Sequence, residues 1–442
     1  MSTLSLKNNK SACWVPTLYF AEGIPYTVVM NLTTIIFFQV LGLSTQDTTM
    51  YLGWLNIPWL IKPLWSPLIQ LIKTSRFWII ACQIFMGALI ACFGLTIPIE
   101  NSFKYIIIIL FLCAFSSATH DIAADGFYID NLSQKEQSFW VGIRNTCYRI
   151  AMVVAQGGIV LLASKLELFT NDKYMAWAYA LIIIGVLLSL IGVYHLFVLP
   201  KKQKTDNPND NSSNKSQSII YYILIGFVLQ IKDYIKKDGI GLAISFLLVY
   251  RLAEALLLRI GQIFLLDEVN NGGVGLTTEQ YGLIYGTIGV IAMIIGGILG
   301  GIAIARYGLR KMLFPMLIIL NVPDVFYLLI SVCNITNIFH IGCMVAIEQF
   351  GYGFGFTAFT VYMLHISKGE YATCHYAIST MFMTMGLMLP SMISGYLKDI
   401  LGYNLFFILV LICSIPSFIL AFYVRNDNFV NQTQDERQTD RN

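Results

Sequence analysis

The chain alternates between long apolar runs and short polar connections. Twelve apolar segments are apparent, at residues 14–40, 48–71, 77–99, 105–130, 139–168, 173–199, 239–267, 278–305, 312–333, 338–366, 372–397 and 405–424. Each reaches the length of about 20 residues that an α-helix needs to cross a bilayer. We therefore expect an all-α integral membrane protein with twelve transmembrane helices, surrounded by lipid.

A polar stretch divides these helices into two sets of six. Residues 200–217, "PKKQKTDNPNDNSSNKSQ", have the composition of a flexible linker. We expect a tail at 1–13, a six-helix bundle at 14–199, a linker at 200–238, a second six-helix bundle at 239–424 and a tail at 425–442. A basic turn follows the second helix of each half, "KTSRF" and "ARYGLRKM", which is typical of a duplicated transporter fold.

Composition and charge agree with this architecture. Hydrophobic residues make up 57% of the chain and charged residues 12%, about half the charged fraction of a soluble domain. Lysine and arginine gather in one set of loops, which places both termini in the cytoplasm and accounts for the net charge of +3 without a nucleic-acid partner. The nine cysteines lack C-x-x-C spacing, so we expect neither disulfides nor zinc. We also expect no cofactor and a monomeric protein.

Ionisable residues inside apolar segments are candidate functional residues, because they are costly to bury and normally face a cavity or a partner. They are Glu22, Lys62, Asp121, Asp125, Arg144, Arg149, Arg251, Glu254, Arg259 and Glu348. All but Glu348 belong to the first, second, fourth, fifth or seventh segment, which predicts a polar site shared by these helices.

The fourth segment carries the densest group, in "SSATHDIAADGFYID" at residues 116–130. Asp121 and Asp125 are four residues apart and share a helix face, with Tyr128 near the next turn. Paired carboxylates repel, which raises the proton affinity of one of them. We therefore predict that Asp121 and Asp125 take part in proton coupling, together with Glu22 of the first segment.

The arginines of the fifth segment allow two interpretations. Arg144 and Arg149 can neutralise Asp121 and Asp125 in a structural charge cluster, and we expect Asp125 to pair with one of them. Arg149 also shares a face with Gln156, and an arginine fork beside an amide suits a ligand with carboxylates and hydroxyls. Arg144 can instead extend to the cytoplasmic interface.

Four further residues complete the predicted substrate site: Lys62, Tyr128, Arg251 and Glu254. In the seventh segment Arg251 and Glu254 are three residues apart, a spacing that allows an ion pair within one helix. Either this pair is purely structural, or it is a gating pair that substrate breaks.

The second basic turn has a recognisable pattern. Gly297 and Gly301 precede "RYGLRK", which approximates the G-x-x-x-D-R-x-G-R-[RK] signature of the major facilitator superfamily. The resemblance implies that these glycines allow close helix contact and that Arg306 and Arg310 bond helix-end carbonyls, so all four are predicted gating residues. The alternative is an ordinary positively charged loop.

Four motifs together resemble the AmpG-type muropeptide permeases, of the peptide, acetyl-coenzyme A and drug transporter branch of that superfamily. They are "LYFAEGIPY" at 18–26, "WLIKPLWSPLIQ" at 59–70, "SSATHDIAADGFYID" at 116–130 and "RNTCYRIAMVVAQGG" at 144–158. The resemblance implies a major facilitator fold and proton symport of peptidoglycan-recycling products, N-acetylglucosaminyl-anhydro-N-acetylmuramic acid with or without peptide, across the inner membrane into the cytoplasm.

Other functions stay open at this point. Siderophore and acetyl-coenzyme A carriers of the same branch also take anionic ligands, and a transport-dead sensor of wall fragments is a further alternative. His120 and Asp125 match the H-x-x-x-x-D spacing of glycerolipid acyltransferases, but two residues form a weak pattern and the chain lacks the soluble domain of such an enzyme. We therefore expect a transporter and not an enzyme.

Overall fold

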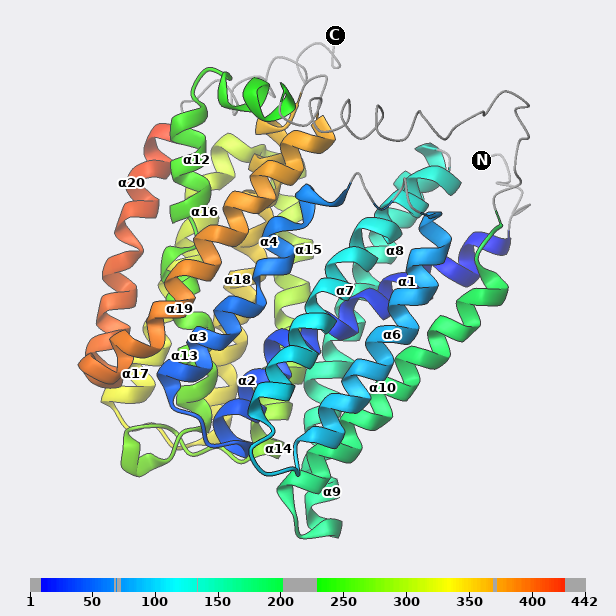
Figure 1. Cartoon of the computed structure of the whole chain (residues 1–442). Coiled ribbons are helices and arrows are strands. Elements are labelled where there is room, and N and C mark those ends of the chain that lie inside the picture. The colour runs from blue at the N-terminus through cyan, green and yellow to red at the C-terminus, as the bar shows by residue number, and fades with distance from the viewer. Residues whose placement is uncertain are drawn as a thin grey trace. The chain divides into compact units, whose positions relative to one another are not determined.

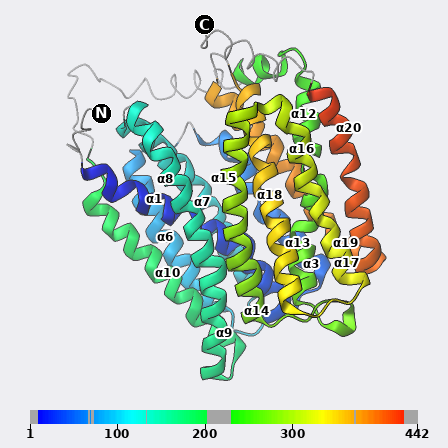
Figure 2. The same cartoon turned by 180° about the vertical axis from the view of Figure 1, so that it is seen from behind.

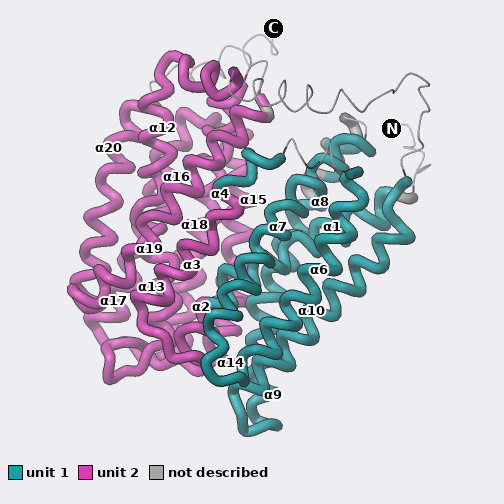
Figure 3. Tube along the Cα trace, viewed as in Figure 1, with its two compact units in different colours: residues 1–33, 61–220 teal, residues 34–60, 221–442 magenta. Residues whose placement is uncertain are grey.

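The computed structural model describes residues 9–66, 69, 73–132, 134–201, 229–368 and 372–425. Regular secondary structure in these residues is entirely helical, as the sequence predicts (Figure 1). The chain forms two compact units, one from residues 1–33 and 61–220 and the other from 34–60 and 221–442 (Figure 3). Most of the predicted tails and linker, namely 1–8, 202–228 and 426–442, lies outside the described residues.

The first unit is built from long helices that continue through π-helical turns. Its helices are α1 (Asn9–Thr27), α6 (Ser75–Thr96), α7 (Phe103–Asn131), α8 (Gln134–Val153), α9 (Ile159–Thr170) and α10 (Lys173–Val198). Val28–Leu32 extends α1 and Val154–Gly158 joins α8 to α9, both as π-helix. The Asp172 carboxylate accepts hydrogen bonds from two backbone N–H groups at the start of α10, which satisfies donors that a helix terminus leaves unpaired.

Within this unit α6 and α10 run side by side (Figure 1). Gly87 of α6 and Gly185 of α10 lie at the contact between the two helices, and a Cβ at either position would collide with the carbonyl oxygen of the other glycine. Arg76, in the basic turn "KTSRF", donates to the carbonyls of Leu196 (2.6 Å) and Leu199 (3.1 Å) at the end of α10. This basic turn therefore caps a neighbouring helix.

The second unit contains the remaining helices. They are α3 (Thr45–Leu55), α4 (Ile57–Ile61), α12 (Ile240–Val249), α13 (Leu252–Leu266), α14 (Thr278–Tyr281), α15 (Val290–Tyr307), α16 (Leu309–Asn321), α17 (Val325–Val332), α18 (Ile338–Ile366), α19 (Ala372–Cys413) and α20 (Ile415–Val424), with α2 (Thr33–Ile35) at the boundary along the chain. Lys237, just before α12, donates to the carbonyls of Ile366 and Lys368 at the end of α18. Burial lowers the pKa of the Lys237 ammonium, and the Asp233 carboxylate opposes that shift.

The predicted helical segments are present, with differences at two places. In the described residues, nine helical stretches are long and apolar enough to cross a membrane. Segments 372–397 and 405–424 fall in one of them, 374–424, which turns at Gly402 (φ 69°), a backbone conformation that favours glycine. The predicted segment 48–71 is interrupted between α3 and α4 at Asn56.

Glycines bring α15 and α18 into close contact in the second unit (Figure 2). A Cβ at Gly296 would collide with the Phe350 carbonyl oxygen, and one at Gly353 with the Met293 carbonyl oxygen. The Thr357 hydroxyl donates to the Gly297 carbonyl across the same contact, at 3.2 Å. The α18 glycines thus serve packing within one uninterrupted helix.

The second unit includes a helix from the N-terminal half of the sequence. Helix α3 packs on α19, where a Cβ at Gly395 would collide with the side chain of Thr49 and the backbone of Thr45. The Thr49 hydroxyl donates to the Met392 carbonyl at 3.5 Å. Residues 34–60 therefore belong to the second unit, although they precede most of the first.

The close contact between α15 and α18 predicts that replacing a glycine by alanine destabilises the protein only where the glycine touches the other helix. We expect Gly353→Ala to lower the free energy of unfolding by about 1–3 kcal/mol, the usual cost of overpacking. Gly301→Ala is the matched control, because no atom lies within 4 Å of a Cβ built there. Thermal unfolding of the two detergent-purified variants would measure the difference, and equal unfolding midpoints would contradict this packing.

Candidate functional site

An arginine held between a carboxylate and two aromatic rings forms one part of the site in the first unit. The Arg144 guanidinium lies 3.1 Å from the Asp125 carboxylate and donates to the Tyr19 hydroxyl at 3.0 Å. Tyr19 in turn donates to Asp125 at 3.3 Å. The guanidinium also lies 4.4 Å from the Tyr19 ring centroid and 5.2 Å from that of Tyr128, within cation–π range. Of the two arginines considered for Asp125, the structure places Arg144 beside it.

Two further carboxylates lie beside a lysine in the same unit. The Lys62 ammonium is 3.9 Å from Asp121, and both side chains are partly buried. One carboxylate oxygen each of Glu22 and Asp121 and one ring nitrogen of His120 all lie within 4.8 Å of one another. Oε2 of Glu22 is buried and has no hydrogen-bond partner. The three predicted proton-coupling residues therefore come from α1 and α7, with Glu22 close to Asp121.

The same three side chains are of types that can ligate a metal ion. Carboxylate oxygen and imidazole nitrogen suit several divalent cations. However, the Lys62 ammonium lies near Asp121 and would repel such a cation, and Nε2 of His120 is in contact with the Gln83 amide at 2.9 Å. We therefore interpret the cluster as a charge-paired site and assign no metal to it.

Gln156 lies within the π-helical turn that follows α8. Its Oε1 accepts a hydrogen bond from Asn31 at 2.9 Å, while its Nε2 is buried without a partner. Arg149 is half-buried on the preceding α-helical turn. Because a π-turn changes the helical phase, the seven-residue spacing no longer establishes a common face for Arg149 and Gln156. Tyr128, also in the predicted substrate set, donates to the Gln137 carbonyl.

A buried polar chain links four helices of the first unit. The Gln83 amide of α6 contacts His120 of α7 at 2.9 Å and His195 of α10 at 2.7 Å, and His195 contacts Thr17 of α1 at 3.0 Å. Gln83 and both histidines are fully buried. This chain could not be predicted from the sequence, because its members are far apart and show no regular spacing.

In the second unit, Arg251 and Glu254 form the intrahelical pair that their spacing allows. Two guanidinium nitrogens donate to the two Glu254 oxygens, each at 2.6 Å. Arg251 also donates to the Tyr352 hydroxyl at 3.1 Å and lies over the Phe356 ring at 4.9 Å. The pair sits where α12 ends and α13 begins, and both side chains are buried.

The second unit also contains two buried acidic residues, Glu348 on α18 and Asp324 in the turn before α17. Glu348 is 5% exposed and accepts hydrogen bonds from Gln349 (3.0 Å) and Tyr327 (3.5 Å), which are uncharged donors. Asp324 is 3% exposed, and its Oδ2 has no hydrogen-bond partner. Asp324 was not among the predicted site residues, although it is a carboxylate inside the apolar run 312–333. Such residues are functional candidates by default.

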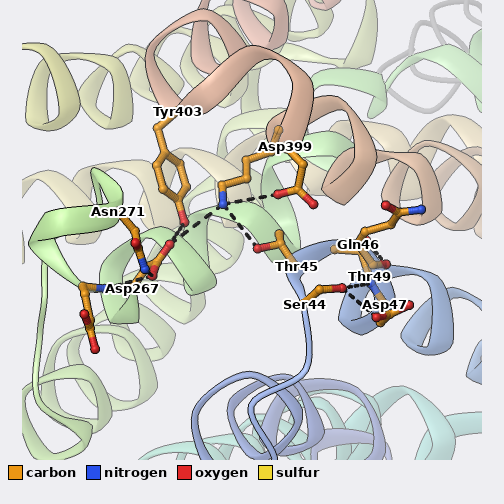
Figure 4. Close-up of polar contacts among 11 residues, drawn as sticks. Ser44, Thr45, Gln46, Asp47, Thr49, Asp267, Asn271, Asp399 and Tyr403 are labelled. Atoms are coloured by element: carbon orange, nitrogen blue, oxygen red, sulfur yellow. Dashed lines mark hydrogen bonds and ion pairs between the residues drawn. The ribbon is translucent and has the colours of Figure 1, made fainter.

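A network around Lys398 of α19 joins α3 and the end of α13 (Figure 4). The Lys398 ammonium lies 3.9 Å from Asp267, 3.4 Å from Asp399 and 3.3 Å from the Thr45 hydroxyl. Figure 4 shows Tyr403 and Asp267 pointing toward one another, and the tyrosine hydroxyl donates to this carboxylate at 2.7 Å. The network fixes the start of α3 against α19 and was also missed from the sequence.

Of the predicted gating residues, Arg306 lies in the last turn of α15 and Arg310 in the first turn of α16, while Gly297 and Gly301 lie within α15. Arg306 is exposed and lies 5.4 Å from the Tyr307 ring centroid, while Arg310 is half-buried. Gly297 takes part in the contact with α18, whereas Gly301 faces open space. The close approach expected at Gly301 is found one residue earlier, at Gly300, where a Cβ would meet the Phe354 carbonyl at 2.7 Å.

Many long apolar helices around buried clusters of charged and amide side chains define a multi-pass membrane transporter. Comparison with family models agrees with this class: the model of the Major Facilitator Superfamily matches residues 17–266 and 243–441. The chain belongs to this superfamily. It is therefore a secondary transporter of small molecules and not an enzyme.

Its sequence relatives are distant. The chain is 22% identical over 447 residues to the anhydromuropeptide permease of Escherichia coli (strain K12), covering 94% of this chain and 82% of that protein. It is 26% identical over 380 residues to putative transporter AmpG 2 of Rickettsia typhi (84% and 86% covered) and 25% identical over 438 residues to putative transporter AmpG 3 of Rickettsia prowazekii (94% and 99%).

Solved structures with the same fold are more distant still in sequence. A bacterial homologue of the human lysosomal transporter Spinster matches with a TM-score of 0.66 and 13% identity, over 96% of this chain and 98% of its own. The nucleoside transporter NupG matches with a TM-score of 0.66 and 14% identity, over 94% and 98%. These likenesses confirm the major facilitator fold.

The pairing of Asp125 with Arg144 can be tested by exchanging the two charges. We expect Arg144→Asp alone to reduce the yield of folded protein, since two carboxylates then face each other. Combining it with Asp125→Arg should recover part of that yield, measured by fluorescence-detected size-exclusion chromatography. The pairing is wrong if the double variant is no better than the worse single variant.

In the Lys398 network, we expect the burial of each carboxylate to determine its contribution to stability more than its distance from the ammonium does. Asp267 is nearly buried, so Lys398→Met should lower the free energy of unfolding by about 1–3 kcal/mol by removing the cation beside it, although its hydrogen bonds from Tyr403, Asn271 and the Glu268 N–H remain. The Asp399 side chain is 40% exposed, and Asp399→Asn should cost less than about 1 kcal/mol although Asp399 is the nearer carboxylate. Thermal unfolding of the two variants compares them, and the reverse order would refute this account.

Proposed function

We propose that this protein is a proton-coupled importer of anhydromuropeptides, acting in the inner membrane of a bacterium and carrying cell-wall turnover products from the periplasm to the cytoplasm. The similarity to the anhydromuropeptide permease of Escherichia coli and to the putative AmpG transporters of Rickettsia supports the substrate class. The four sequence motifs in the first half of the chain point the same way.

The observation that carries the coupling proposal is the close approach of Glu22 and Asp121 beside Lys62. Two carboxylates at this separation disfavour double ionisation, so the pair binds a proton more readily than an isolated carboxylate. One ammonium nearby cannot neutralise both charges. Asp121 is the carboxylate we assign to proton coupling, with Glu22 as its partner, while Asp125 stays with Arg144.

The proposed substrate site uses donors that suit an anionic sugar. Lys62, Arg144 and Arg149 supply positive charge, and the unpartnered Nε2 of Gln156 supplies a donor for a hydroxyl or an amide oxygen. Tyr128 offers a ring face beside Arg144. A substrate carboxylate would compete with Asp121 or Asp125 for these cations, which links substrate binding to the protonation of the carboxylates.

The second unit would contribute gating. The Arg251–Glu254 pair is fully formed and buried, so a substrate that engages Arg251 must offer an equivalent charge-assisted bond. Arg306 and Arg310, with Gly297 and Gly301, remain our proposed gating residues at the loop between α15 and α16. We propose that the transporter acts as a monomer.

Uptake into proteoliposomes tests the proposal directly. We expect labelled anhydromuropeptide to accumulate when an inward proton gradient is imposed and not in its absence. Asp121→Asn should abolish gradient-driven accumulation while leaving substrate exchange across the membrane in place, because the proton site alone is lost. A siderophore and acetyl-coenzyme A serve as competitors.

The outcomes separate the parts of the proposal. Uptake of a labelled siderophore or of labelled acetyl-coenzyme A, with no uptake of anhydromuropeptide, would overturn the substrate class. Gradient-driven accumulation by Asp121→Asn would overturn the assignment of this residue.

A further inference from the structure

The Gln83 amide stands between two fully buried histidines and contacts each by a different atom. Its Oε1 lies 2.7 Å from Nδ1 of His195, and its Nε2 lies 2.9 Å from Nε2 of His120. Neither an amide nor two histidines are needed to fill an apolar helix contact, and most buried polar groups in proteins are hydrogen-bonded. The arrangement therefore has a specific consequence for where the protons lie.

The amide fixes the tautomer of both rings. An amide oxygen only accepts, so Nδ1 of His195 must carry a proton. Its Nε2 lies 3.0 Å from the Thr17 hydroxyl, which also lies within hydrogen-bond distance of the Cys13 and Trp14 carbonyls. An amide N–H only donates, so Nε2 of His120 must be the acceptor. A neutral imidazole has one N–H group, and in His120 this group is consequently on Nδ1.

This N–H group is left over. Nδ1 of His120 is buried and has no hydrogen-bond partner, and the same is true of Oε2 of Glu22. A ring nitrogen of His120 lies within 4.8 Å of carboxylate oxygens of both Glu22 and Asp121. An unused donor and an unused acceptor thus belong to side chains of the same cluster.

We propose that His120 is the hydrogen-bond donor to the ionised Glu22–Asp121 pair, and that Gln83 and His195 are positioning residues that keep the donor proton on Nδ1. A donor stabilises the charged form of a carboxylate, so His120 sets the pH at which the pair gives up its proton. The inference rests on the proposed proton coupling and names the group that tunes it. His120 itself stays neutral throughout and carries no proton across the membrane.

The other charges around the pair do not replace this donor. Lys62 is near Asp121, and Arg144 with Asp125 also acts on Glu22 through space. Both cations are partly exposed, at 32% for the Lys62 side chain and 26% for that of Arg144, whereas His120 is fully buried. A hydrogen bond from a buried group is screened less by water than an ion pair at the edge of a site.

Two substitutions of His120 separate a donor role from a titrating role. In His120→Asn the side-chain amide can occupy the place of Nδ1 and still donate, while in His120→Gln it reaches the place of Nε2 and leaves the Nδ1 position empty. Neither amide titrates. The pH titration of the carboxylic-acid C=O band would be followed by infrared difference spectroscopy on the reconstituted protein, with Glu22→Gln and Asp121→Asn used to assign the band.

We expect His120→Asn to leave the midpoint of this titration unchanged and His120→Gln to move it to higher pH by about one unit, the effect of losing one charge-assisted hydrogen bond. Equal shifts in both variants would mean that His120 titrates, and unchanged midpoints in both would mean that it does not act on the pair. Either result overturns the proposal.

A second measurement does not depend on substituting His120. Solid-state NMR of the wild-type protein with isotope-labelled histidine should show the proton on Nδ1 in both His195 and His120. Only the His120 ring should change in Gln83→Glu, since two acceptor oxygens there would draw its proton to Nε2 while the Nδ1 proton of His195 keeps an acceptor. Finding the proton of His120 on Nε2 in the wild type would refute the proposal. Neither measurement uses a substrate, so a failure of anhydromuropeptide uptake leaves both results interpretable.

Discussion

Ionised groups surrounded by apolar helices must be paired, because no water is available to solvate them. The described residues follow this constraint in both units. In the first unit Asp125 is paired with Arg144 and shared with Tyr19, and in the second Glu254 is held by two bonds from Arg251. These residues lie on α1, α7 and α8 in the first unit and at the start of α13 in the second, whereas the close glycine contacts lie between α6 and α10 and between α15 and α18.

The two units meet this constraint in different ways. In the second unit the Arg251–Glu254 pair is closed within one helix turn, and Glu348 is satisfied by uncharged donors. In the first unit Glu22 and Asp121 share a cluster with one ammonium and a histidine, and buried polar atoms remain without partners. Incomplete pairing suits a site that changes its protonation, since a carboxylate whose charge is fully paired has a low affinity for a proton.

Much of this could be read from the sequence, and the limits have physical causes. The helices follow from long apolar runs, and the pairing of Arg251 with Glu254 follows from helical periodicity, because both depend on neighbours along the chain. The Gln83 chain and the Lys398 network join residues more than a hundred positions apart, and periodicity says nothing about those contacts. The relation of Arg149 to Gln156 was inferred from a regular helix, and the intervening π-turn removed that basis. Asp324 is a different case, because its burial in an apolar run was visible and was not used.

The placement of α3 has a consequence for the order in which this protein forms. A chain is synthesised from its N-terminus, and its N-terminal parts generally fold first. Yet Thr49 of α3 contacts Met392, 343 residues later, so the helix on which α3 chiefly packs, α19, is made only near the end of synthesis. The N-terminal half is therefore synthesised well before α3 can complete this contact. Packing of α3 on α19 is consequently a late step of folding, and it brings together a helix from the N-terminal half of the sequence and one from the C-terminal half.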